Sequence, residues 1–229
     1  MTQTVAKRMC IDNVNVYYEY HQSSHNSGNR TFLLIHGFLS STFSFRQLIP
    51  LLRKKFNVVS VDLPGFGKSE KSLTFRYSYA NYAQIMIRLI DRLSLRNIVL
   101  IGHSMGGQIA LNVAKQIPDT IERCILLSSS AYLKKARRII IYSSYLPFVG
   151  YFMKQWFGKK DVKKNLRTVV YDPSLITKEM IAGYSEPFYE KGFLDCMLRL
   201  LRHREGDMTS DELRTIQTPC LVVWGKEDR

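Results

Sequence analysis

The motif with the clearest catalytic potential in this sequence contains a serine with one glycine two residues before it and another two residues after it. Residues 102–106 read Gly-His-Ser-Met-Gly, directly after an apolar run and directly before a helical pattern. Such a sharp strand–turn–helix connection exposes the serine at the end of the strand, and the helix N-terminus supplies N–H donors where an oxyanion would form. Side chains in place of the glycines would collide with neighbouring elements. The context favours Ser104 as a nucleophile over a serine in an ordinary glycine-rich turn.

A second motif offers a backbone N–H group that could act together with that serine. His36-Gly37-Phe38 follows an apolar run and opens a loop ahead of a helix expected over Phe45–Arg53. The small residue lets the backbone N–H of Phe38 point across to the N–H of Met105. Two such donors would form an oxyanion hole, each contributing on the order of 3 kcal/mol of transition-state stabilisation. His36 is interpreted as a structural residue packed under the loop rather than as a general base.

A third motif, Asp62–Ser69, reads DLPGFGKS after another apolar run. Its ending resembles a P-loop, but the first glycine of the pattern G-x-x-x-x-G-K-[ST] would fall at Asp62. Nucleotide binding is therefore rejected. We expect a tight structural loop next to the serine.

The elements that position these motifs alternate along the chain. Val14, Val16 and Tyr18 alternate with polar residues and predict a half-exposed antiparallel strand. Continuous apolar runs, typical of strands covered on both faces, lie at Thr31–Ile35, Asn57–Leu63, Asn97–Ile101, Cys124–Ser129 and Cys220–Trp224. Helical patterns lie at Ser78–Ser94, with Ser78 as cap, and at Gly106–Ile117. The order predicts an α/β fold with a doubly wound, mostly parallel sheet.

This alternation stops at Ser130. The stretch 131–206 has helical and aromatic character without a convincing strand and is interrupted by prolines and glycines. An apolar pattern typical of a strand then returns at Cys220–Trp224. We therefore expect a core over 1–130, an inserted helical cap over 131–206, and a return to the core over 207–229.

Four motifs together, HGF, DLPGFGKS, GHSMGG and the terminal WGKED, resemble those of the α/β-hydrolase superfamily. The resemblance covers essentially the whole chain and implies an eight-stranded sheet, a helical cap between strands six and seven, and a Ser–Asp–His triad in that chain order. By position it makes Ser104 the nucleophile, Asp228 the acid, and the N–H groups of Phe38 and Met105 the oxyanion hole. A serine nucleophile differs from the aspartate of the haloalkane dehalogenase and epoxide hydrolase branches.

The sequence departs from this family in its histidines. The resemblance implies a catalytic histidine some way after Asp228, whereas the sequence ends at Arg229 and its histidines all precede the acid: His21, His25, His36, His103 and His203. We interpret His203 as a solvated surface residue. The expectation is that this sequence stops before the catalytic base, without which Ser104 would be nearly inert.

Charge is concentrated in one part of the chain. The net charge is +14, and the stretch 131–170 holds ten basic residues and one acidic residue, Asp161. Within it, Ile139–Phe157 is apolar and aromatic with a single charge, Lys154. One interpretation is a pair of cap helices packed on the core. The alternatives are an acyl-binding lid that associates weakly with an anionic membrane surface, and a cationic entrance for a carboxylate substrate. No motif supports nucleic-acid binding.

The N-terminus and the cysteine spacing disfavour a secreted, disulfide-bonded or zinc-binding protein. The N-terminus lacks the apolar region of a signal peptide, and the cysteines (Cys10, Cys124, Cys196 and Cys220) lack metal-site or disulfide-framework spacing. These features predict a cytoplasmic protein. Neither a metal nor an organic cofactor is expected.

The leading hypothesis is a serine hydrolase that cleaves a carboxylic ester, or a related acyl bond, of a small or acyl-chain substrate. One alternative is a carbon–carbon bond hydrolase with the same triad. Another is a hydrolase-fold receptor that binds a small ligand under the cap and turns it over slowly.

Overall fold

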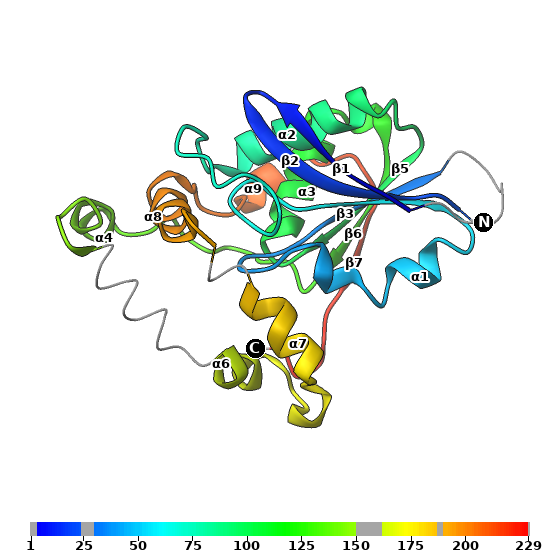
Figure 1. Ribbon diagram of the computed structural model, residues 1–229. Coiled ribbons are helices and arrows are strands. Elements are labelled where there is room, and N and C mark those ends of the chain that lie inside the picture. The colour runs from blue at the N-terminus through cyan, green and yellow to red at the C-terminus, as the bar shows by residue number, and fades with distance from the viewer. Residues whose placement is uncertain (1–3, 24–29, 150–161, 187–189, 229) are drawn as a thin grey trace.

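A seven-stranded sheet forms the centre of the protein (Figure 1). The computed structural model describes residues 4–23, 30–149, 162–186 and 190–228. The strand order is β1-β2-β4-β3-β5-β6-β7; β1 and β2 run antiparallel to their neighbours, and the other pairs are parallel. The strands are β1 (Thr4–Ile11), β2 (Val14–His21), β3 (Thr31–Ile35), β4 (Asn57–Val61), β5 (Ile98–His103), β6 (Ile121–Leu127) and β7 (Cys220–Val223). The predicted α/β class and mostly parallel sheet are confirmed.

Alternate residues of the central strands enter two hydrophobic cores, one on each face of the sheet. In β3, Leu33 and Ile35 join the core that contains α2 and α3, whereas Phe32 and Leu34 pack with Phe45 on the other face. This double covering explains why the run TFLLI is entirely apolar after its first residue.

Two helices flank Ser104 in sequence and pack on one another. They are α2 (Tyr79–Arg92) and α3 (Met105–Gln116), close to the predicted ranges. The side chain of Ser78 accepts a hydrogen bond from the N–H of Asn81, so its predicted role as helix cap is confirmed.

Two expectations about the first 60 residues are wrong. The helix expected over Phe45–Arg53 is instead a 3-10 turn, η1 (Thr42–Phe45), followed by a single helical turn, α1 (Ile49–Leu52). Pro50 lacks the N–H that a continuous helix would need there. β2 is not half-exposed. Val14, Val16 and Tyr18 are buried on one side of the strand, as predicted, and Tyr17 is buried on the opposite side.

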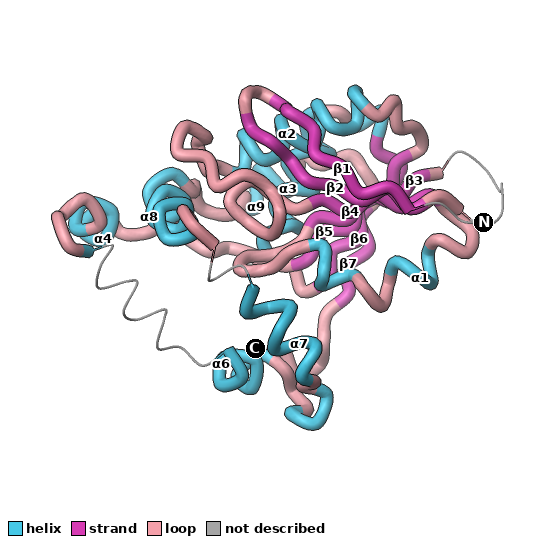
Figure 2. Tube along the Cα trace, viewed as in Figure 1, coloured by secondary structure: helices cyan, strands magenta, loops and turns pink. Residues whose placement is uncertain are grey.

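In the described chain between the paired strands β6 and β7, the regular elements are all helices, joined by loops (Figure 2). It contains α4 (Arg138–Ser143), α6 (Val162–Val169), η3 (Pro173–Leu175), α7 (Lys178–Ser185), α8 (Phe193–His203) and α9 (Ser210–Arg214). A 3-10 turn, η2 (Pro118–Thr120), precedes β6. Residues 150–157 of the predicted apolar stretch, with Lys154, lie outside the described residues. The boundaries of the cap stay a prediction. No described helix combines the length and apolar character needed to cross a bilayer.

Candidate active site

Ser104 stands between β5 and α3 with backbone angles φ 51° and ψ −119°. A residue other than glycine at such a positive φ is strained, typically by about 1–3 kcal/mol, and persists only where the surroundings enforce it. Here the Ser104 N–H donates to the carbonyl of Leu127 at 3.1 Å, while the Ser104 carbonyl accepts from Gly107 at 2.9 Å and Ser130 at 3.2 Å. These bonds tie the turn to its own helix and to the end of β6.

The glycines around Ser104 are required by close backbone contacts. A Cβ on Gly102 would lie 2.6 Å from the Cα of Gly107, and one on Gly106 would lie 2.6 Å from the carbonyl oxygen of His36. A Cβ on Gly37 would lie 3.0 Å from the Cβ of Ser104. The turn after β5 and the loop after β3 therefore press directly on one another, as the two sequence motifs predicted.

Three of the four predicted site residues share one cavity of about 390 Å³, namely Ser104, Phe38 and Met105. Met105 is the first residue of α3, and the N–H groups of a first helical turn have no acceptor within the helix. The positive end of the helix dipole also lies at this point. A carbonyl group bound in the cavity would therefore contact both Ser104 and the N-terminus of α3. The oxyanion role of Phe38 and Met105 stays a prediction.

The rest of the cavity wall comes from residues that the sequence motifs did not indicate. Tyr79 begins α2, and Arg204 follows α8. The guanidinium of Arg204 donates to the Tyr79 hydroxyl at 3.3 Å, which in turn donates to the buried carboxylate of Asp207 at 3.0 Å. Burial raises the pKa of Tyr79 to about 12, with Arg204 opposing this rise. The cavity therefore holds a phenol that stays protonated and a permanent cation.

Asp228 follows β7, as the motif WGKED predicted, and it is exposed. Its N–H donates to the carbonyl of Gly225 at 3.1 Å. Its carboxylate raises the pKa of His103, against a larger lowering by burial of the imidazole. Asp228 is not among the residues that line the Ser104 cavity. Its role as catalytic acid stays a prediction.

The side chains of the other described histidines contact groups other than Ser104. His36 is fully buried under the loop: its Nε2 accepts from the N–H of Leu63 at 3.0 Å, and burial lowers its pKa to about 4. His203, expected to be solvated, is partly buried, and its Nδ1 accepts from the N–H of Tyr77 at 3.3 Å. His21 lies beside Glu19, with Nε2 3.3 Å from a carboxylate oxygen. His25 lies outside the described residues.

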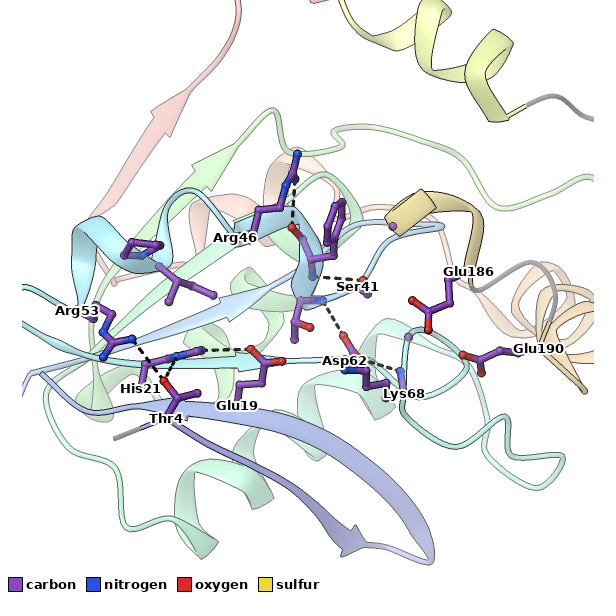
Figure 3. A pocket seen from close by; sticks show the side chains of 16 residues that line it. Thr4, Glu19, His21, Ser41, Arg46, Arg53, Asp62, Lys68, Glu186 and Glu190 are labelled. Atoms are coloured by element: carbon purple, nitrogen blue, oxygen red, sulfur yellow. Dashed lines mark hydrogen bonds and ion pairs between the residues drawn. The ribbon is translucent and has the colours of Figure 1, made fainter. Parts of the chain in front are cut away.

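A second cavity, of about 380 Å³, contains acidic and basic side chains (Figure 3). It lies beside η1 and β2, and Ser104 is not among its lining residues. Asp62 borders it and accepts from the backbone N–H groups of Thr42 at 2.6 Å and Lys68 at 2.7 Å. These bonds fix the loop over Asp62–Ser69, and the prediction of a tight structural loop is confirmed.

The fold, the strained serine turn and its glycines together define a hydrolase of the α/β-hydrolase fold. The model of the alpha/beta hydrolase fold family matches residues 30–144, and this chain belongs to that family. It is 47% identical over 223 residues to the uncharacterized hydrolase YugF of Bacillus subtilis (strain 168), covering 97% of this chain and 81% of that protein.

Two further similarities span most of the chain. A 2-hydroxy-6-oxononadienedioate/2-hydroxy-6-oxononatrienedioate hydrolase of a Pseudomonas species is 25% identical over 219 residues, covering 91% of this chain and 75% of that protein. The crystal structure of a bacterial membrane phospholipase A superposes with a TM-score of 0.75 at 25% identity, covering 99% of this chain and 71% of that chain.

Proposed function

We propose that this protein is a serine hydrolase that cleaves carboxylic esters, or related acyl bonds, of a small or acyl-chain substrate. The observation that carries the proposal is the strained Ser104, held in a cavity with the N-terminus of α3. Apolar side chains of Met197, Leu200 and Leu201 line the same cavity and suit an acyl group. The name of one relative in structure, a phospholipase A, is that of an ester hydrolase and supports the same chemistry.

In the proposed reaction, Ser104 Oγ attacks the carbonyl carbon of the ester and its proton passes to a general base. The N–H groups of Phe38 and Met105 hold the oxyanion of the tetrahedral intermediate. The alcohol then leaves with that proton, and water hydrolyses the acyl-enzyme to release the acid and free Ser104. His21, His36 and His203 are engaged elsewhere. In the family order, the histidine that serves as this base follows the acid.

A fluorophosphonate probe, which reacts with activated serines, tests the nucleophile. Intact-mass analysis of the protein from its natural source should show one adduct, and peptide mapping should place it on Ser104. Ser104→Ala should abolish both the adduct and the turnover of short p-nitrophenyl esters, a loss of at least about 10³-fold. Ser130→Ala is the matched control, because Ser130 lines the same cavity. An adduct that survives in Ser104→Ala contradicts the proposal.

One observation favours carbon–carbon bond hydrolysis as a second candidate. The guanidinium of Arg204 lines the cavity and could pair with a substrate carboxylate, and one relative is named for hydrolysis of a dienedioate. If this is the function, Arg204→Gln should raise KM for a carboxylate-bearing vinylogous diketone by about 10-fold or more, with little change in KM for a neutral ester. Equal effects on both substrates would contradict this candidate.

A further inference from the structure

The chain after β6 presents large apolar side chains to solvent around the short helix α4. Ile139 is 74% exposed, Tyr142 69% and Phe148 73%. Tyr145 and Leu146 continue the same surface and are also mostly exposed. Isolated exposed apolar residues are ordinary, but a contiguous group of this size marks an interaction site. We call residues 132–148 the α4 surface.

Basic residues adjoin these apolar side chains without an acidic neighbour in the sequence. Lys134, Lys135, Arg137 and Arg138 are all exposed, and the stretch 131–149 contains no aspartate or glutamate. Asp207 accepts from the backbone N–H of Leu133 at 3.0 Å, but none of the four cations forms an ion pair with a described residue. Aromatic and aliphatic groups beside such cations match the interface of an anionic bilayer, where the rings enter the headgroup region and the cations meet lipid phosphates. A second copy of this chain fits less well, because docking would bring like charges together.

The α4 surface is attached to a wall of the Ser104 cavity. The guanidinium of Arg202 donates to Ser144 Oγ at 2.8 Å and lies 3.9 Å from the centre of the Tyr145 ring. Arg202 belongs to α8, which supplies Met197, Leu200 and Leu201 to the cavity. Leu133 borders the cavity and lies within the α4 surface. Figure 1 shows α4 beside α8, at the end of the molecule away from α1.

We propose that the α4 surface binds anionic phospholipid bilayers and so brings the Ser104 cavity to the lipid–water interface. The binding step stands on exposure and charge alone. Only its consequence, delivery of an acyl substrate from the interface, rests on the proposed function. Ser104→Ala should therefore bind vesicles as the unmodified protein does, which separates failure of docking from failure of catalysis.

Cosedimentation of the protein with phosphatidylcholine vesicles, with and without phosphatidylglycerol, tests the proposal. We expect binding only when phosphatidylglycerol is present, and release at high salt. Arg137→Gln combined with Arg138→Gln should weaken binding by about 30-fold, from the contribution of two cations near an anionic surface. The matched control is Arg88→Gln with Arg92→Gln, which removes two exposed cations from α2.

The apolar part of the surface has its own variant and control. Ile139→Ser with Tyr142→Ser should also lower binding to vesicles that contain phosphatidylglycerol, whereas Leu51→Ser, at an exposed leucine of α1, should not. Circular dichroism and thermal melting check that each variant is folded. Equal binding to neutral and anionic vesicles, or binding indifferent to both α4 pairs, overturns the proposal. So does a dimer in sedimentation velocity that Ile139→Ser with Tyr142→Ser dissociates, because the surface is then a contact between copies.

Discussion

Asp62 joins two loops through a carboxylate that is almost fully buried. One oxygen accepts from the N–H of Thr42 and the other from the N–H of Lys68. Burial nevertheless outweighs these bonds and raises the pKa of Asp62 to about 6. The side chain therefore binds a proton more readily in the folded protein than in the unfolded chain, where the pKa is about 3.9.

This difference has a definite sign in the pH dependence of stability. Because the folded state binds more protons between pH 4 and 6, the stabilisation from protonated Asp62 is present below about pH 4 and is lost as the pH rises through 6. Asp62→Asn removes this titration. The unfolding free energy of the unmodified protein minus that of Asp62→Asn should therefore fall by about 2 kcal/mol from pH 4 to 7.

Urea unfolding at several pH values measures that difference. Asp91→Asn, at an exposed position of α2, is the control and should leave the pH dependence unchanged. A free-energy difference between Asp62→Asn and the unmodified protein that stays constant with pH would show that Asp62 does not titrate in this range.

The sequence predicted those residues of the cavity whose local backbone is unusual. Ser104 lies between glycines, and Phe38 follows one, so residue type and spacing reveal both positions. Tyr79 and Arg204 meet at the cavity although 125 positions separate them in the chain. Their contact depends on how α2 and the segment after α8 pack, which no local pattern encodes.

At the scale of elements, the strands that the sequence predicts are again those with a distinctive local pattern. The strands β3 and β4 are predicted because both of their faces are buried and mostly apolar, which leaves apolar runs in the sequence, broken in β4 by Ser60. The strand β1 was not predicted. It lies at the edge of the sheet, with Lys7 and Arg8 exposed, and its pairing with β2 requires few apolar side chains.

The C-terminus of α2 offers a test at this scale. The Leu95 N–H donates to the carbonyl of Ile90 and the Ser94 N–H to that of Asp91, which is the hydrogen-bond pattern of a Schellman motif. This motif requires a left-handed residue, usually glycine, but here Ser94 adopts a φ of 48°. Ser94→Gly should raise the unfolding free energy by about 0.5–1 kcal/mol, because it removes the Cβ penalty at an exposed site.

Chemical denaturation of Ser94→Gly and Ser94→Ala separates the backbone effect from loss of the hydroxyl. Alanine keeps the Cβ and should give no gain in stability. If both variants are equally stabilised, the left-handed conformation is not the cause.

At the scale of the whole molecule, the two edges of the sheet differ in their protection. The strand order places β1 and β7 at the edges. Charged residues protect β1, whereas the residues of β7 are Cys-Leu-Val-Val, and Leu221, Val222 and Val223 are about half exposed. Among the described residues, no strand pairs with the outer side of β7. An apolar edge of this kind pairs readily with another chain.

We therefore expect a polypeptide limited to residues 1–229 to associate reversibly through β7 as its concentration rises. Val222→Lys should weaken this association, because a lysine on an edge strand opposes pairing and adds like charge to a protein of net charge +14. Sedimentation velocity over a wide concentration range measures the effect. Ala6→Lys adds the same charge to the exposed face of β1 and serves as the control. If both lysine variants reduce association equally, net charge is responsible and the β7 edge is not the contact.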